Sequence, residues 1–231
     1  MTIVSSSQPW VTVAASWARA EPERGRYDAA ALARVRVAVN EVRRAGAEPV
    51  VVVHAGALPL WQIDRGGWLD RDAVATWGCW VERLAEAVVD RVGTWISLHT
   101  PLDEARAYGA DVTRAGRALL EAAAVARIHL RRNAGFGGRP GRVGVVERLD
   151  ADDGVALGEA LTTGRLRAPW GRIGELSGGG PAVDFVGVLG DAPAVAVDRV
   201  WAARLPLVAC GGAPWAPAAR ARGAWVLAEL T

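Results

Sequence analysis

The chain has 231 residues, of which 51% are hydrophobic, and its 27 basic and 25 acidic residues leave a formal net charge of +2. This length and apolar content suffice for one well-filled core, so we expect a single domain over 1–231. Because charges of both signs are interspersed and no basic run appears, the sequence argues against a nucleic-acid partner.

Signals for a membrane or for a metal are not found in the sequence. No apolar stretch reaches the ~18 residues that span a bilayer. The first ten residues lack the charged and apolar regions of a signal peptide. The two cysteines, Cys79 and Cys210, have no metal or redox spacing. We therefore expect a cytoplasmic protein that has no membrane partner and no metal or other cofactor.

Strand and helix patterns alternate along the chain. Short apolar runs predict strands at 11–16, 50–54, 94–98, 143–146, 183–189 and 206–209. Amphipathic stretches between and after them predict helices at 28–45, 72–90, 101–132, 154–162, 195–203 and 216–230. Asp28 is the candidate N-cap of the first helix, and Gly46 its C-terminal stop. Strands separated by helices predict a parallel sheet, and unbroken Val/Ile/Leu strands are typical of burial on both faces.

The most informative motif lies at the end of the strand predicted at 94–98, where the sequence is WISLHTP. It resembles glycoside hydrolase family 1, the β-glucosidase family, which has W-I-T-x-N-E-P there. The segment 11–61 is similar to that family's Y-R-F-S-I-A-W-x-R-I-x-P motif, followed by a helix and H-W-D-L-P. The DFVGV run at 184–188 is similar to the family's D-F-x-G-x-N-Y-Y.

The resemblance implies an α/β fold of the (β/α)8 TIM-barrel type. Such a barrel typically takes about 250 residues, and family members are longer than this chain. The match begins at their second strand. The run 2–5 is a candidate for the first strand, and no pattern marks an eighth. We therefore expect a trimmed or incomplete barrel whose uncovered sheet edges are closed by a homodimer or by a different partner chain.

The catalytic carboxylates of the family are replaced. Its acid/base Glu corresponds to Thr100 and its nucleophilic Glu to Cys210, whereas retaining hydrolysis needs two carboxyl groups ~5–5.5 Å apart. A threonine hydroxyl cannot deliver a proton near neutral pH as a tuned carboxylic acid does. The Arg of the second-strand motif corresponds to Thr12, and the Asn-Tyr pair to Leu189 and Gly190. These losses predict no ordinary glycosidase activity.

Three residues are candidates for a new catalytic group, because ligands of such barrels bind at the C-terminal ends of the strands. His99, in place of the family's Asn, can exchange protons near pH 7. Cys210 is a candidate thiolate nucleophile with His99 as its base, the alternative being a small buried residue. Glu147 is a candidate carboxylate base, and the alternative is a surface pair with an arginine. A structural role is the alternative for His99.

The candidate substrate-binding residues follow the same strands: Trp17, His54, Trp61, Thr100, Glu104 and Trp215. His54 matches the family's sugar-contacting His, with a buried histidine bonded to a backbone carbonyl as the alternative. Glu104 lies at a predicted helix start, where capping is the alternative role. Trp17, Trp61 and Trp215 could stack on a sugar or a cation. Four further tryptophans fall where the family has core and helix aromatics, so the resemblance implies that most of them pack in the core: Trp68, Trp77, Trp80 and Trp95.

Three functions are consistent with this pattern. The first is a glycosidase-like barrel repurposed as a non-hydrolytic small-molecule biosynthetic protein, or as an enzyme subunit, in bacterial specialised metabolism. The second is a non-catalytic subunit that binds a ligand or a partner chain, a pseudo-glycosidase. The third is a residual β-glycosidase. New polar groups at the old catalytic positions favour the first, although the fold alone does not name a reaction.

Overall fold

The computed structural model describes residues 10–132, 141–148, 152–172, 174–189, 207–210 and 225–227. Its centre is a seven-stranded sheet in which every pairing is parallel. In spatial order the strands are β1 (Trp10–Ala14), β2 (Glu48–Val52), β3 (Thr94–His99), β4 (Arg142–Glu147), β7 (Phe185–Leu189), β8 (Leu207–Cys210) and β9 (Trp225–Leu227). Spatial order follows chain order, as in a (β/α) barrel, and β1 and β9 end the described sheet.

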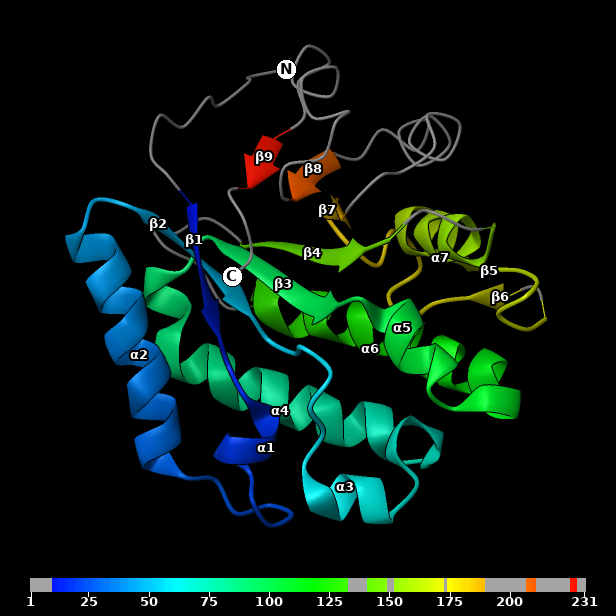
Figure 1. Cartoon of the computed structure of the whole chain (residues 1–231), viewed down its shortest axis with the longest axis horizontal. Coiled ribbons are helices and arrows are strands. Elements are labelled where there is room, and N and C mark those ends of the chain that lie inside the picture. The colour runs from blue at the N-terminus through cyan, green and yellow to red at the C-terminus, as the bar shows by residue number, and fades with distance from the viewer. Residues whose placement is uncertain are drawn as a thin grey trace.

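Helices pack on the outer face of this sheet (Figure 1). They are α1 (Trp17–Ala20), α2 (Ala29–Arg44), α3 (Leu60–Asp64), α4 (Ala73–Val88), α5 (Pro101–Arg106), α6 (Val112–Arg132) and α7 (Asp152–Thr163). One-turn helices η1 (Gly67–Leu69), η2 (Val89–Arg91) and η3 (Gly109–Asp111), and a small antiparallel pair, β5 (Arg165–Leu166) and β6 (Gly174–Glu175), complete the described elements. None of the helices in the described ranges is long and apolar enough to cross a membrane.

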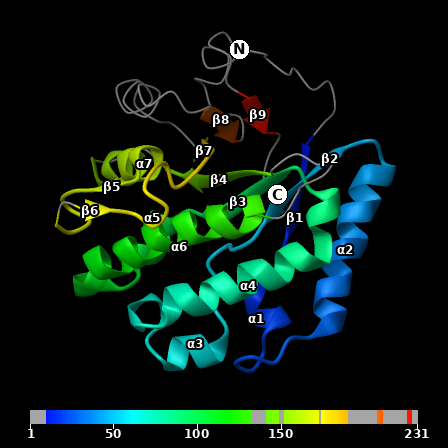
Figure 2. The same cartoon turned by 180° about the vertical axis from the view of Figure 1, so that it is seen from behind.

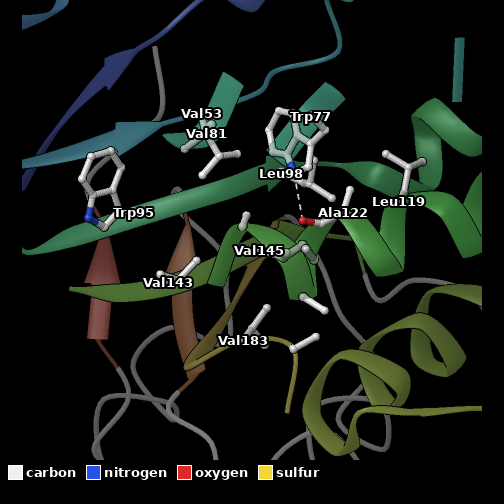
Figure 3. Packing of buried hydrophobic residues seen from close by; sticks show 14 of the residues in the cluster. Val53, Trp77, Val81, Trp95, Leu98, Leu119, Ala122, Val143, Val145 and Val183 are labelled. Atoms are coloured by element: carbon white, nitrogen blue, oxygen red, sulfur yellow. Dashed lines mark hydrogen bonds between the residues drawn. The ribbon is translucent and has the colours of Figure 1, made fainter. Parts of the chain in front are cut away.

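The core has two layers, one on each face of the sheet. The outer layer lies between the sheet and the helices, where α4 and α6 run side by side (Figure 2). Trp77 of α4 crosses this layer and donates its indole N–H to the Ala122 carbonyl of α6 at 2.9 Å (Figure 3). The inner layer is smaller and consists of Val50, Val52, Ile96, Val146 and Phe185.

The inner layer requires glycine at one strand position. A Cβ on Gly144 of β4 would come within 2.3 Å of the Phe185 ring. Since the ring is buried and the neighbouring strands hold it in place, no side chain fits there. The alternation of Val50 and Val52 with Val51 and Val53 between the two layers follows the period of two of a β-strand.

The expected parallel α/β arrangement is confirmed, including the Asp28 cap, whose carboxylate accepts the Ala30 backbone N–H at 2.8 Å. The final helix predicted at 216–230 is wrong over Trp225–Leu227, which form β9 and add a strand that no sequence pattern marked. The helix predicted at 101–132 is broken into α5, η3 and α6. The short α3 was not predicted. The strand proposed at 2–5 and the helix at 195–203 lie outside the described residues.

Candidate functional site

The C-terminal ends of β2, β3 and β4 meet at one edge of the sheet. The His99 backbone N–H donates to the His54 carbonyl at 3.0 Å, and the Thr100 N–H donates to the Val146 carbonyl at 2.7 Å. Cys210 ends β8 at the same edge, because its backbone pairs with Leu189 at the end of β7. These strand ends therefore form one rim. Trp215 lies outside the described residues, and the description of Cys210 is limited to its backbone.

His99 lies on the inner face of the rim. A β-bulge between Ile96 and Leu98 shifts the register so that His99 pairs with Val146, a residue of the inner layer. Residues paired in register share a face of the sheet. The His99 side chain is half-buried. Its pKa is lowered, first by burial and then by the positive charge of Arg148, which outweigh the opposite effect of Asp103.

Thr100 turns the chain sharply at the rim. Its φ of 50° and ψ of 55° are left-handed, and it is the one non-glycine residue with positive φ in the described ranges. For a β-branched residue this conformation is an outlier that costs on the order of 1–3 kcal/mol. The hydrogen bond to the Val146 carbonyl holds it there, and α5 begins at the next residue. Such strain is concentrated at functional sites, which supports the rim as the candidate site.

His54 and Glu104 form a buried pair on the helix side of the rim. The His54 Nε2 atom lies 2.8 Å from Oε2 of Glu104, whose Oε1 accepts the Trp68 indole N–H at 2.6 Å. The His54 side chain is 1% exposed and packs edge-on against the Trp68 and Trp77 rings. His54 is buried, as its alternative role supposed, but its partner is a carboxylate and not a backbone carbonyl. Capping does not describe Glu104 either, since its carboxylate bonds side chains.

Glu147, the last residue of β4, links this strand to the start of α5. It is fully buried, and its two carboxylate oxygens accept the backbone N–H groups of Leu102 and Arg148, each at 2.7 Å. Burial raises the pKa of Glu147 to about 7, although these two hydrogen bonds act in the opposite direction. The alternative of a surface pair with an arginine is wrong, because the side chain has no exposed surface. The carboxyl group is held in place by the start of a helix.

Trp17 and Trp61 lie beside the rim in a tryptophan cluster. The Trp17 indole is 1% exposed and donates to Oε2 of Glu21 at 2.6 Å. Trp61 is half-buried, packs edge-on against Trp17 at 5.9 Å between centroids, and donates to the Glu21 carbonyl. The four tryptophans that were expected in the core are buried, as predicted: Trp68, Trp77, Trp80 and Trp95.

Glu21, which no sequence pattern marked, is 3% exposed and bonds several groups of this cluster. Besides Trp17, it accepts the Gly25 backbone N–H at 2.7 Å. In the sequence it precedes a polar run, PERGR, and nothing distinguishes it from an exposed acid. Within the described ranges no group of three His, Cys, Asp or Glu side chains gathers as a metal site would require.

The fold is similar to part of the barrel of solved β-glycosidases. A β-glycosidase from Pyrococcus horikoshii superposes with a TM-score of 0.77, at 16% identity, over 94% of this chain and 69% of its own. A β-glucosidase from Exiguobacterium marinum gives 0.71 at 18%, over 88% and 64%. A Thermotoga maritima β-glucosidase in complex with deoxynojirimycin gives 0.61 at 20%, over 79% and 50%.

At these identities the similarity shows the fold, a parallel α/β arrangement matching part of a TIM barrel. The chain spans about half to two-thirds of the length of these structures. No protein-family model and no curated protein matches the sequence.

Proposed function

We propose that this chain is a glycosidase-like barrel repurposed for a non-hydrolytic step on a small molecule in bacterial biosynthesis, alone or as an enzyme subunit. The observation that carries the proposal is the position of His99, an imidazole on the inner face of the rim. In the family that the sequence resembles, this position holds an Asn, and the next one, Thr100 here, holds the acid/base Glu.

The internal bonds of two carboxylates at the rim support a non-hydrolytic role. Glu104 is engaged by His54 and Trp68, and Glu147 by the backbone N–H groups at the start of α5. The oxygens of both groups are occupied by these hydrogen bonds, which argues against their use as the acid or the nucleophile that hydrolysis of a glycosidic bond requires. The rim therefore offers an imidazole in place of a carboxylate pair.

The chemistry that this imidazole suits is proton transfer. Because burial and Arg148 lower the pKa of His99, its neutral form prevails at pH 7, and a neutral imidazole accepts a proton. A small molecule bound inside the barrel would place an acidic C–H, O–H or N–H against the ring. Cys210, at the end of β8 on the same rim, is the candidate nucleophile, with His99 as its base.

A non-catalytic ligand- or partner-binding subunit is the second candidate. Glu104, His54 and Glu147 all form internal bonds that preserve the shape of the rim, which is equally consistent with a site that binds without reacting. In this case the protein would bind its ligand at the rim without converting it.

Two assays test the proposal. Aryl β-glucosides and β-galactosides should be hydrolysed no faster than in buffer, and turnover near that of an ordinary glycosidase would contradict the proposal. A bacterial metabolite extract incubated with the protein should lose a component and gain a product, as followed by mass spectrometry. His99→Gln should abolish that conversion while the melting temperature stays close to that of the wild type.

A matched control separates a base from a structural residue. His129 lies on α6, away from the rim, so His129→Gln should leave the conversion unchanged. If a component binds but no product forms, the second candidate is correct. If His99→Gln converts the component as the wild type does, His99 is not the catalytic base.

A further inference from the structure

A cavity lies between β1 and α2, and none of its lining residues belongs to the rim around His99. Its volume is about 250 Å³. α2 lies alongside β1 (Figure 1). Ala14 and Ser16, at the end of that strand, are among the residues that line the cavity. It lies on the helix side of β1, where Val13 belongs to the outer layer, whereas His99 faces the inner layer. The two sites are therefore on opposite faces of the sheet.

The floor of the cavity is apolar and underfilled. Trp80 and Val13 line the cavity, and their side chains are 0% and 7% exposed. Ala31, Val35 and Ala38 line it at helical spacing along one face of α2. Since two of these three residues are alanines, the helix and the strand leave space that larger side chains would fill in an ordinary core.

Two arginines give the cavity positive charge. Arg19 of α1 and Arg34 of α2 both line it. Arg34 reaches Asp28 at 3.6 Å, in a pair whose two side chains are 65% and 42% exposed, so the bond is weak. Arg19 forms no ion pair with any described residue. A guanidinium group binds carboxylates through two parallel hydrogen bonds.

We propose that this cavity binds a small organic carboxylate, with the apolar body against Trp80 and the α2 alanines and the anionic head between Arg19 and Arg34. The volume falls just below the ~300–1,000 Å³ range of drug-sized ligands, so it suits a medium acyl chain or one aromatic ring. Charge complementarity favours the anion over a neutral or cationic molecule. This binding is independent of the function proposed for the His99 rim.

Titration calorimetry of the full chain with octanoate tests the proposal. We expect a Kd of about 1 mM or tighter for a ligand of this size. Arg19→Gln should weaken binding about tenfold, because charge-assisted hydrogen bonds contribute at that level. Arg36→Gln is the matched control: Arg36 is exposed on α2 but does not line the cavity, so binding should not change.

Two further measurements distinguish a site from a packing gap. Ala38→Leu fills the cavity and should abolish octanoate binding. 1-Octanol has the same chain without the charge and should bind at least tenfold more weakly. The proposal is overturned if octanoate does not bind, if it binds equally to Ala38→Leu, or if octanol binds as tightly.

Discussion

Glu147 and Glu104 are both acids near the end of β3 or β4, and their surroundings give them different partners. Glu147 accepts only backbone N–H groups and is fully buried, whereas Glu104 accepts from two side chains and is 12% exposed. Sequence patterns identified both positions but not their partners. For Glu147 the consequence is a pKa raised from 4.5 to about 7 by burial.

Glu147 should make the protein less stable as the pH rises. Between about pH 4.5 and 7 the folded state keeps a proton that the unfolded state has released, so the unfolding free energy falls through this window. The loss is at most about 3–4 kcal/mol, since the pKa rises from 4.5 to about 7 and each pKa unit corresponds to 1.36 kcal/mol. Urea unfolding at pH 5 and pH 8 should show the fall in the wild type, and Glu147→Gln should show less of it. The exposed Glu23→Gln variant should behave as the wild type; an equal fall in all three would contradict the assignment.

His99 should titrate below its ordinary pKa of 6.5, because burial and Arg148 disfavour its charged form. NMR titration of the three histidines, with the His99 signal assigned by its loss in His99→Gln, measures this directly. Arg148→Gln should raise the pKa of His99, and Arg114→Gln, which removes a distant charge, should not. A His99 pKa above 6.5 in the wild type would mean that the ring is more exposed or pairs with an acid.

At the scale of elements, side-chain bonds decide where α5 begins and where it ends. The predicted 101–132 helix is interrupted after Arg106, and Gly109, which opens η3, takes a positive φ of 56°. The Tyr108 hydroxyl accepts the Trp68 backbone N–H at 2.9 Å, which joins the end of α5 to η1. The helical periodicity of this stretch could not predict that contact, because Trp68 and Tyr108 are 40 residues apart.

Glu104 joins the loop after β2, the one-turn helix η1 and α5. Glu104→Ala would leave the Trp68 indole and the His54 ring without their partner in a buried cluster, and should lower the unfolding free energy by about 2–4 kcal/mol. Glu104→Gln keeps one acceptor and should cost less. Asp103→Ala, on the same helix but exposed, is the control and should stay within about 0.5 kcal/mol. Chemical denaturation measures all three, and an unchanged Glu104→Ala would show that the cluster holds without the carboxylate.

The strand β9 shows tertiary context overriding local preference. The stretch 216–230 is rich in Ala, Leu and Arg, which are good helix formers, and this composition predicted a helix. Trp225–Leu227 instead pair with β8 and extend the parallel sheet. The hydrogen bonds to a neighbouring strand outweigh the propensity difference, which is at most about 1 kcal/mol per residue.

At the scale of the molecule, β1 and β9 are the two ends of the described sheet. An open edge pairs readily with another chain, and Val11 of β1 is 41% exposed. We expect the purified chain to form a homodimer, or to bind a partner chain on co-expression, with more than ~1,000 Å² buried in the interface. Light scattering at several concentrations measures this. A stable monomer with no co-purifying partner would show that the barrel closes on itself.

The sequence by itself determined the succession of parallel strands and helices, the Asp28 cap and the burial of four tryptophans. The succession of elements and the cap depend on residues close together in the chain, where periodicity and capping act, whereas the tryptophans were assigned to the core through the family resemblance. The tertiary structure alone decided the inner position of His99, the His54–Glu104 pair across 50 residues and the buried state of Glu21 and Glu147. Desolvation and hydrogen-bond partners depend on which elements pack together. A local pattern in a single sequence does not predict this packing.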